Sequence, residues 1–280
     1  MFNFTKKEIY KLQVQEYRVF RTILGAPSYA ANATLRGEIG SSAMGSRVIK
    51  DRLLLTKSLM GSENELVRTV FKKVVEERDH SKWNKRTREY LEIMGLEYKD
   101  LETMNKRAIK ERVRIYDTVM WRREIAEKSS IGIYKANKKE VREAQCYGNT
   151  EASKILFRAR TNTMDLSDRY RHDKIENRRS TICRLCKKET EDLTHFLLKC
   201  EEIKRRDTEM IKELEGRCEK ETLGKMLFKG ERVKEVGEMI YAMWKERKGK
   251  KIMEEMKEKN ENRENKEKNE NRENTRSLDT

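Results

Sequence analysis

Cys183-Arg-Leu-Cys186-Lys-Lys-Glu-Thr-Glu-Asp-Leu-Thr-His195-Phe-Leu-Leu-Lys-Cys200 is a run of eighteen residues that contains three thiols and one imidazole, spaced as C-x2-C-x8-H-x4-C. Three cysteines and one histidine form an ordinary structural ligand set for Zn²⁺ and leave no coordination position open for a substrate. The spacing therefore predicts one structural zinc ion held by Cys183, Cys186, His195 and Cys200. The alternative is a cluster of buried thiols without a metal, because free cysteine is among the most buried residue types.

The second half of this stretch is predicted to be a short helix over 193–199, with Asp192 as its N-cap. His195 and Cys200 are five residues apart, which places them about 140° out of phase on an ideal α-helix. One of the two must therefore leave the regular helix if both bind one ion. We expect this to be Cys200, at the C-terminal end.

Composition places the stretch in a basic, weakly hydrophobic chain. The 280 residues include 65 Lys and Arg against 49 Asp and Glu, a net charge of +16, and only 36% are hydrophobic. Globular domains usually contain about 45–50% apolar residues, so we expect a thin core spread along amphipathic helices. The excess of positive charge favours a polyanionic partner, either nucleic acid or an acidic membrane surface. The alternative is a highly charged, solvated helical surface.

The N-terminal residues contain no apolar run of signal-peptide length, and no run in the chain approaches the roughly 18 residues of a membrane span. We therefore expect an intracellular protein, nuclear or cytoplasmic or both, without a membrane partner. Reduced cysteines are expected there, which favours a metal over disulfides. The basic run 245–251 could serve as a nuclear address.

Apolar positions elsewhere recur at helical spacing, and the presence of a single proline, Pro27, is typical of long helices. Residues 1–24 are predicted to form a helix that ends at Gly25, because glycine followed by proline stops a helix. The small and glycine-bearing residues 32–45 are expected to be a connecting region before a helix at 47–60.

The most regular apolar stripe in the chain runs from Leu66 to Val75. Asp100 is predicted to cap a helix that reaches Met120, and Asn149 or Thr150 to cap the next one. Further helices are expected over 203–214, 223–227 and 233–244.

The C-terminal residues are a low-complexity segment in which 257–265 is repeated without change at 266–274. With no apolar residue to bury, the repeat is predicted to be disordered or at most a transient helix. Residues 257–280 contain seven Lys and Arg and seven Asp and Glu, so the whole net charge resides in 1–256.

Three further motifs carry a resemblance to a known family: Arg21-Thr-Ile-Leu-Gly-Ala-Pro-Ser28, Asn32-Ala-Thr-Leu-Arg-Gly-Glu-Ile-Gly40 and Phe157-Arg-Ala-Arg160. Together with the cysteine stretch, they resemble the C-terminal part of non-LTR retrotransposon reverse transcriptases over about residues 17–205. The resemblance implies helices from the thumb side of the polymerase, followed by a zinc-binding module.

The resemblance and the residue patterns together predict a mainly α fold: an extended set of amphipathic helices, a small Cys3His zinc module and a disordered charged tail. The expected segments are a thumb-like helical region (1–62), a basic helical linker (63–148), the zinc-binding module (149–217), C-terminal helices (218–248) and the tail (249–280).

Neither catalytic centre of that family is present in this sequence. The polymerase needs two adjacent aspartates and some relatives carry a nuclease with a Pro-Asp motif, yet the chain has no Asp-Asp pair and no proline after Pro27. We therefore expect no enzyme activity. A zinc deaminase is disfavoured as well, because its signature places the histidine before the cysteine pair.

The expected function is binding of RNA or DNA, or both, through basic helices that neutralise phosphates largely without reading sequence. Tyr147 and Tyr170 could stack on unpaired bases, although packing is the more common role of a tyrosine. The alternative is a helical structural or interaction protein that binds protein partners. The basic residues predicted to contact nucleic acid are Arg158, Arg160, Arg169, Arg171, Arg178, Arg179 and Arg184.

Overall fold

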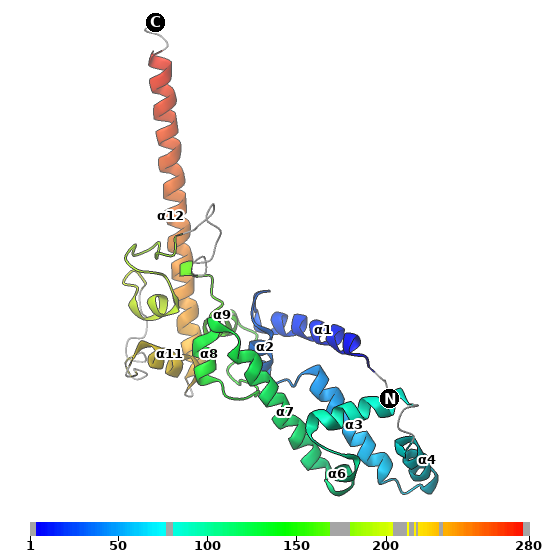
Figure 1. The fold of residues 1–280 in the computed structure, drawn as a ribbon. Coiled ribbons are helices and arrows are strands. Elements are labelled where there is room, and N and C mark those ends of the chain that lie inside the picture. Colours follow the sequence, from blue (N-terminus) through cyan, green and yellow to red (C-terminus); the bar gives the residue numbers. More distant parts are fainter. Residues whose placement is uncertain are drawn as a thin grey trace. The chain divides into compact units, whose positions relative to one another are not determined.

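A computed structural model describes residues 4–76, 81–168, 180–203, 212, 216, 218–229 and 232–276, and Figure 1 shows its elements. The described residues form helices, with one isolated antiparallel bridge between Ile182 and Thr190 in place of a sheet. The chain divides into two compact units, Met1–Gln145 and Cys146–Thr280. The mainly helical fold predicted from the sequence is confirmed.

The first unit contains α1 (Lys6–Leu24), α2 (Asn32–Ile39), α3 (Met44–Met60), α4 (Glu65–Glu76), α5 (Lys82–Met94), α6 (Tyr98–Thr103), α7 (Lys106–Ala126), η1 (Ser129–Ile131) and α8 (Gly132–Asn137). Its main hydrophobic cluster joins α3, α5, α6 and α7, with Leu53, Leu101 and Ile109 fully buried. The segment expected at 1–62 and most of the segment expected at 63–148 lie in this unit, in which α3 contacts both α5 and α7.

Two helix ends of the first unit follow directly from their capping residues. Gly25 adopts the left-handed conformation at φ 58°, and its N–H continues the hydrogen bonding of α1. The predicted end of the first helix is thus confirmed. Asp100 does not cap the long helix, because it lies inside α6, where its carboxylate accepts from the Glu97 N–H at 2.7 Å. Asn105 caps α7 instead, by accepting from the Ala108 N–H.

The prediction of a connecting region at 32–45 is wrong, because the helix α2 lies there and almost all of it is buried. Its small residues permit a close approach of α7 and α8. The Trp121 indole N–H donates to the Ala33 carbonyl at 2.7 Å, and Arg36 forms a buried ion pair with Asp117 at 2.8 Å. Asp117 also accepts from Ser46 at the start of α3. Tertiary burial therefore decides the helical state of a segment whose composition is typical of a loop.

The helix α4 coincides with the apolar stripe expected at 66–75, but little of that stripe is covered. Phe71 is buried, with its ring 5.6 Å from that of Trp83 in an edge-to-face contact. Leu66 and Val70 remain 71% and 52% exposed. The periodicity therefore predicts the helix correctly and overstates its burial.

The second unit is built on three helices, α9 (Glu151–Arg160), α11 (Glu219–Phe228) and α12 (Val233–Arg276). The Thr150 hydroxyl caps α9 by accepting from the Ser153 N–H at 3.1 Å, as predicted. α9 and α11 both pack against the first turns of α12. The predicted apolar stripe of α12 is buried and includes Ile240, Met243 and Trp244.

The rest of the second unit brings the cysteine stretch against α12. Phe196, beside His195, lies with its ring 6.0 Å from that of Trp244 in an edge-to-face contact. The helix predicted over 203–214 lies almost wholly outside the described residues. The expected segments 149–217 and 218–248 therefore meet in one compact unit.

The charged repeat continues α12 as a helix as far as Arg276. The sequence predicts disorder or at most a transient helix there, because nothing between residues 257 and 276 is apolar. Among the described residues, no helix combines the length and the apolar composition needed to cross a lipid bilayer.

Candidate metal centre

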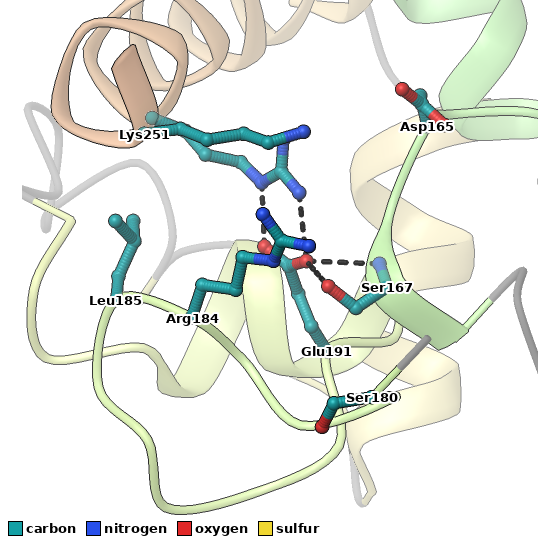
Figure 2. Close-up of a pocket in the computed structure, with 8 residues that line it drawn as sticks. Asp165, Ser167, Ser180, Arg184, Leu185, Glu191 and Lys251 are labelled. Atoms are coloured by element: carbon teal, nitrogen blue, oxygen red, sulfur yellow. Dashed lines mark hydrogen bonds and ion pairs between the residues drawn. The ribbon is translucent and has the colours of Figure 1, made fainter. Parts of the chain in front are cut away.

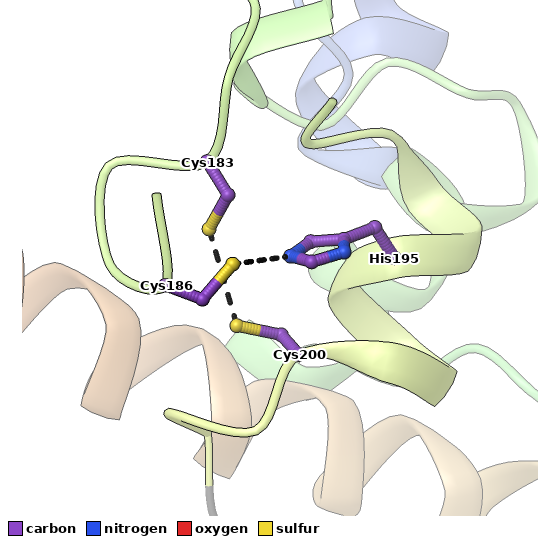
Figure 3. Close-up of side chains that lie close together, drawn as sticks. All are labelled: Cys183, Cys186, His195 and Cys200. Carbon is purple, nitrogen blue, oxygen red and sulfur yellow. Dashed lines mark hydrogen bonds between the residues drawn. The ribbon is translucent and has the colours of Figure 1, made fainter. Parts of the chain in front are cut away.

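The first two candidate ligands project from a tight turn of the backbone. The Cys183 N–H donates to the Glu189 carbonyl at 2.7 Å, and the Lys187 N–H donates to the Cys183 carbonyl at 2.8 Å. Lys187 adopts the left-handed conformation at φ 57°, which closes the turn. Consequently the Cys183 and Cys186 thiols point to the same side of the loop, as Figure 3 shows.

The other two ligands come from a widened helical turn. The Asp192 carboxylate accepts from the His195 N–H at 2.8 Å, so Asp192 caps this turn as predicted. Residues His195–Lys199 then form a π-helical turn, η4, which the Cys200 N–H closes onto the His195 carbonyl at 2.8 Å. The five-residue step of a π turn brings positions 195 and 200 back toward one side. Cys200 itself leaves the helix with an extended backbone, as predicted.

The four predicted ligands converge in the structure. Their ligating atoms all lie within 4.8 Å of one another. The Cys183 and Cys200 sulfurs are 3.9 Å apart, and the Cys186 sulfur lies 3.3 Å from His195 Nε2 (Figure 3). Cys183, His195 and Cys200 are buried, and Cys186 is half-buried. The arrangement could hold a metal ion with protein ligands alone.

The thiols differ in how easily they ionise without a metal. Burial raises the pKa of Cys183 to about 12 and also raises the pKa of Cys200. Burial acts in the same direction on Cys186, but hydrogen bonds from the Lys188 and Glu189 N–H groups outweigh it and lower the pKa of that thiol. A bound cation would supply the charge that keeps the two buried thiols as thiolates.

The second ring nitrogen of His195 faces a carboxylate. Nδ1 is buried without a hydrogen-bond partner, and Glu189 Oε2 lies 3.4 Å from it. A histidine that binds a metal through one nitrogen commonly directs its other N–H to a carboxylate, which fixes the tautomer and the ring. Glu189 therefore fits the role of a supporting partner for His195.

Glu191, two residues further along the chain, pairs with a residue of α12 instead. It is 2% exposed and forms a bidentate ion pair with Arg247 of α12, at 2.5 and 2.7 Å. The N–H and hydroxyl of Ser167 also donate to it. Burial raises its pKa, but the hydrogen bonds from Arg247 and Ser167 outweigh that effect, so its pKa lies below the ordinary value.

The sequence does not single out Arg247, because this residue lies within the basic run 245–251. The apolar periodicity of α12 nevertheless marks its position. Arg247 follows Ile240 by seven residues and Trp244 by three, so it continues the buried stripe of α12. A charged residue on an apolar stripe predicts a buried partner.

The residues predicted to contact nucleic acid have different surroundings. Arg184 is exposed between the first two candidate ligands, Cys183 and Cys186, and Arg158 is half-buried on α9. The prediction for Arg160 needs correction, because this residue is 5% exposed and donates to the Leu227 carbonyl. Arg169, Arg171, Arg178 and Arg179 lie outside the described residues.

Tyr147, for which the sequence favours packing over base stacking, packs against residues of the second unit. The ring of Tyr147 makes an edge-to-face contact with Phe157, at 6.3 Å, and the Arg160 guanidinium lies 5.4 Å from its centroid. Of the two roles considered for Tyr147, packing and base stacking, the structure therefore supports packing. Tyr170 lies outside the described residues.

Comparison with known proteins adds no relative: no protein-family model matches the chain, and no curated protein and no solved structure shows significant similarity.

Proposed function

We propose that this chain is a non-catalytic nucleic-acid-binding module whose second unit is organised around one structural Zn²⁺ ion. The convergence of three thiols and one imidazole within 4.8 Å carries the proposal. That donor set suits Zn²⁺ and fills its tetrahedral coordination, so the ion would supply folding energy to the loop.

The nucleic-acid partner is supported by charge. The net charge of +16 lies entirely before residue 257, in the part of the chain that precedes the charged repeat. Lys and Arg side chains that neutralise phosphates release condensed counterions, so such binding weakens steeply as salt rises. The resemblance of the sequence to the C-terminal part of non-LTR retrotransposon reverse transcriptases supports the same function.

The test is a titration of RNA and DNA oligonucleotides, single- and double-stranded, with zinc-loaded protein at several salt concentrations. We expect the logarithm of the affinity to fall linearly with the logarithm of the salt concentration, with a slope equivalent to several phosphates. Binding that is absent at low salt, or independent of salt, would exclude the proposed nucleic-acid partner.

A second candidate function, interaction with another protein, is favoured by one observation. The apolar face of α4 is exposed at Leu66, Val67 and Val70, by 71%, 36% and 52%. Exposed apolar patches mark interaction sites when they are contiguous. A change of Leu66 and Val70 to glutamate that abolishes self-association or capture of a defined partner, while oligonucleotide binding persists, would support this function.

A further inference from the structure

A hollow beside the metal loop, the stretch 180–200 that carries the candidate metal ligands, combines residues from three segments of the second unit. It is small, is partly open to solvent and lies between the segment after α9, the metal loop and α12. Figure 2 shows the side chains that line it. These residues are Asp165, Ser167, Ser180, Arg184, Leu185, Glu191, Arg247 and Lys251.

Among the described residues that line the hollow, three are cationic and two are anionic. The Glu191 carboxylate and the Arg247 guanidinium neutralise each other in their bidentate ion pair. Arg184 and Lys251 then contribute two positive charges, and Asp165 contributes one negative charge. A phosphodiester carries a single negative charge, which this cationic majority of the described lining would attract.

The donors of the hollow suit a phosphate oxygen. Arg184 offers a planar fork of N–H groups and Lys251 an ammonium group, and the two come from different elements. The Ser180 hydroxyl oxygen already accepts from the Ile182 N–H at 3.1 Å, so its own O–H can donate toward a ligand. Donors that converge from separate segments can bind one anion from more than one side.

Arg184 is tied to the metal centre by its position in the chain, since it lies directly after Cys183 and two residues before Cys186. A metal held by both cysteines would fix the backbone on either side of Arg184. The floor of the hollow, formed by Glu191 and Arg247, joins the same loop to α12. Occupancy of the metal centre should therefore govern whether Arg184 and Lys251 face the hollow together.

From this arrangement we infer a phosphate-binding subsite: Arg184 and Lys251 together hold one phosphodiester of a nucleic-acid backbone, in a hollow that the metal loop completes. This inference rests on the proposed function, and it names the place where one phosphate is bound.

The experiment measures binding of a fluorescent single-stranded oligonucleotide to the zinc-loaded full chain, by anisotropy. The variants are Arg184→Gln, Lys251→Gln and the double variant. The matched controls are Lys188→Gln, on the same loop, and Lys248→Gln, on α12; both side chains are exposed and neither lines the hollow. Circular dichroism and zinc content verify that each variant is folded.

We expect each hollow variant to weaken binding about tenfold, as the loss of a charged hydrogen bond does, and the controls to weaken it much less. Since both residues hold one phosphate, the double variant should lose less than the sum of the two effects. Asp165→Asn should strengthen binding, because it removes one carboxylate from the lining of the hollow. Removal of zinc with a chelator should abolish the difference between wild type and Arg184→Gln.

Three results would overturn the inference, and they are distinguishable. Hollow variants that match the controls while the wild type binds would exclude the subsite and leave the proposed function intact. Competition by inorganic phosphate at low millimolar concentration would assign the hollow to free phosphate instead of a backbone. Absence of binding by the wild type at low salt would remove the proposed function itself.

Discussion

Glu191 is the residue at which the metal loop, the segment after α9 and α12 meet. Its carboxylate is 2% exposed and receives hydrogen bonds from Arg247 and Ser167. A buried ion pair contributes little net stability, but the loss of one partner leaves the other charge buried and uncompensated. Removal of Glu191 would therefore lower stability mainly because it would leave the charge of Arg247 buried and uncompensated.

We predict that Glu191→Gln destabilises the second unit by about 3–5 kcal/mol, the usual cost of breaking a buried ion pair. Chemical unfolding followed by the fluorescence of Trp244 measures the effect. Glu201→Gln is the matched control, because Glu201 pairs with Lys188 on the surface. An equal effect of both substitutions would contradict the assigned role of Glu191.

The same pair predicts a pH dependence. The hydrogen bonds lower the folded-state pKa of Glu191, so its contribution is complete above the unfolded-state pKa of about 4.3 and is lost as the pH falls through the lower folded-state value. The stability difference between wild type and Glu191→Gln should therefore be constant near neutral pH and shrink below about pH 4. A difference that grows on acidification would refute this linkage.

At the scale of the elements, α2 shows how tertiary contacts override composition. Gly37 allows α2 to approach α7 and α8 closely: a Cβ at this position would lie 2.3 Å from the Tyr134 hydroxyl and 2.9 Å from Trp121 Cζ2. Both aromatic residues are almost fully buried. Gly37 therefore serves packing, even though glycine lowers helix propensity.

We predict that Gly37→Ala destabilises the first unit by about 1–3 kcal/mol, the usual cost of overpacking, although alanine favours helices. Gly45→Ala in α3 is the control, since a Cβ there meets no atom within 4 Å. That control should be neutral or stabilising by up to about 1 kcal/mol. Urea unfolding followed by the fluorescence of Trp83 and Trp121 compares them; a stable Gly37→Ala variant would contradict the packing of α2.

The sequence predicts correctly those features that neighbouring residues determine. The end of α1 at Gly25 and the Thr150 cap of α9 each depend on hydrogen bonds within a few residues of the chain, and both predictions are confirmed. The burial of α2 and the exposure of α4 depend on residues distant in the chain, so periodicity and composition do not predict them. The convergence of the four candidate metal ligands was predictable because a chelate requires a fixed spacing, whereas the Glu191–Arg247 pair joins positions 56 residues apart.

For the whole molecule, the proposed binding depends on how the net charge is distributed along the chain. Residues 257–280 are balanced, with seven cationic and seven anionic residues, and the net charge of +16 belongs to residues 1–256. Long-range attraction of a polyanion depends on net charge and is screened by salt. The folded part should therefore account for the proposed binding.

We predict that a chain ending at Met256 retains its zinc content and binds oligonucleotides with an affinity within about twofold of the full chain, because the removed part carries no net charge. Anisotropy titrations of both proteins at the same salt concentration provide the comparison. A tenfold or larger loss of affinity would show that residues 257–280, and not residues 1–256, supply the main contacts.

The metal content of the purified full chain, measured by elemental mass spectrometry, tests the proposed zinc centre most directly. We predict one tightly held zinc ion per chain, lost together with helical signal in a Cys183→Ser, Cys186→Ser double variant. It should be retained when Cys146 and Cys218, which lie outside the cluster, are changed to serine. A folded wild-type chain that contains no zinc, and takes up none when it is supplied, would contradict the proposed structural zinc centre.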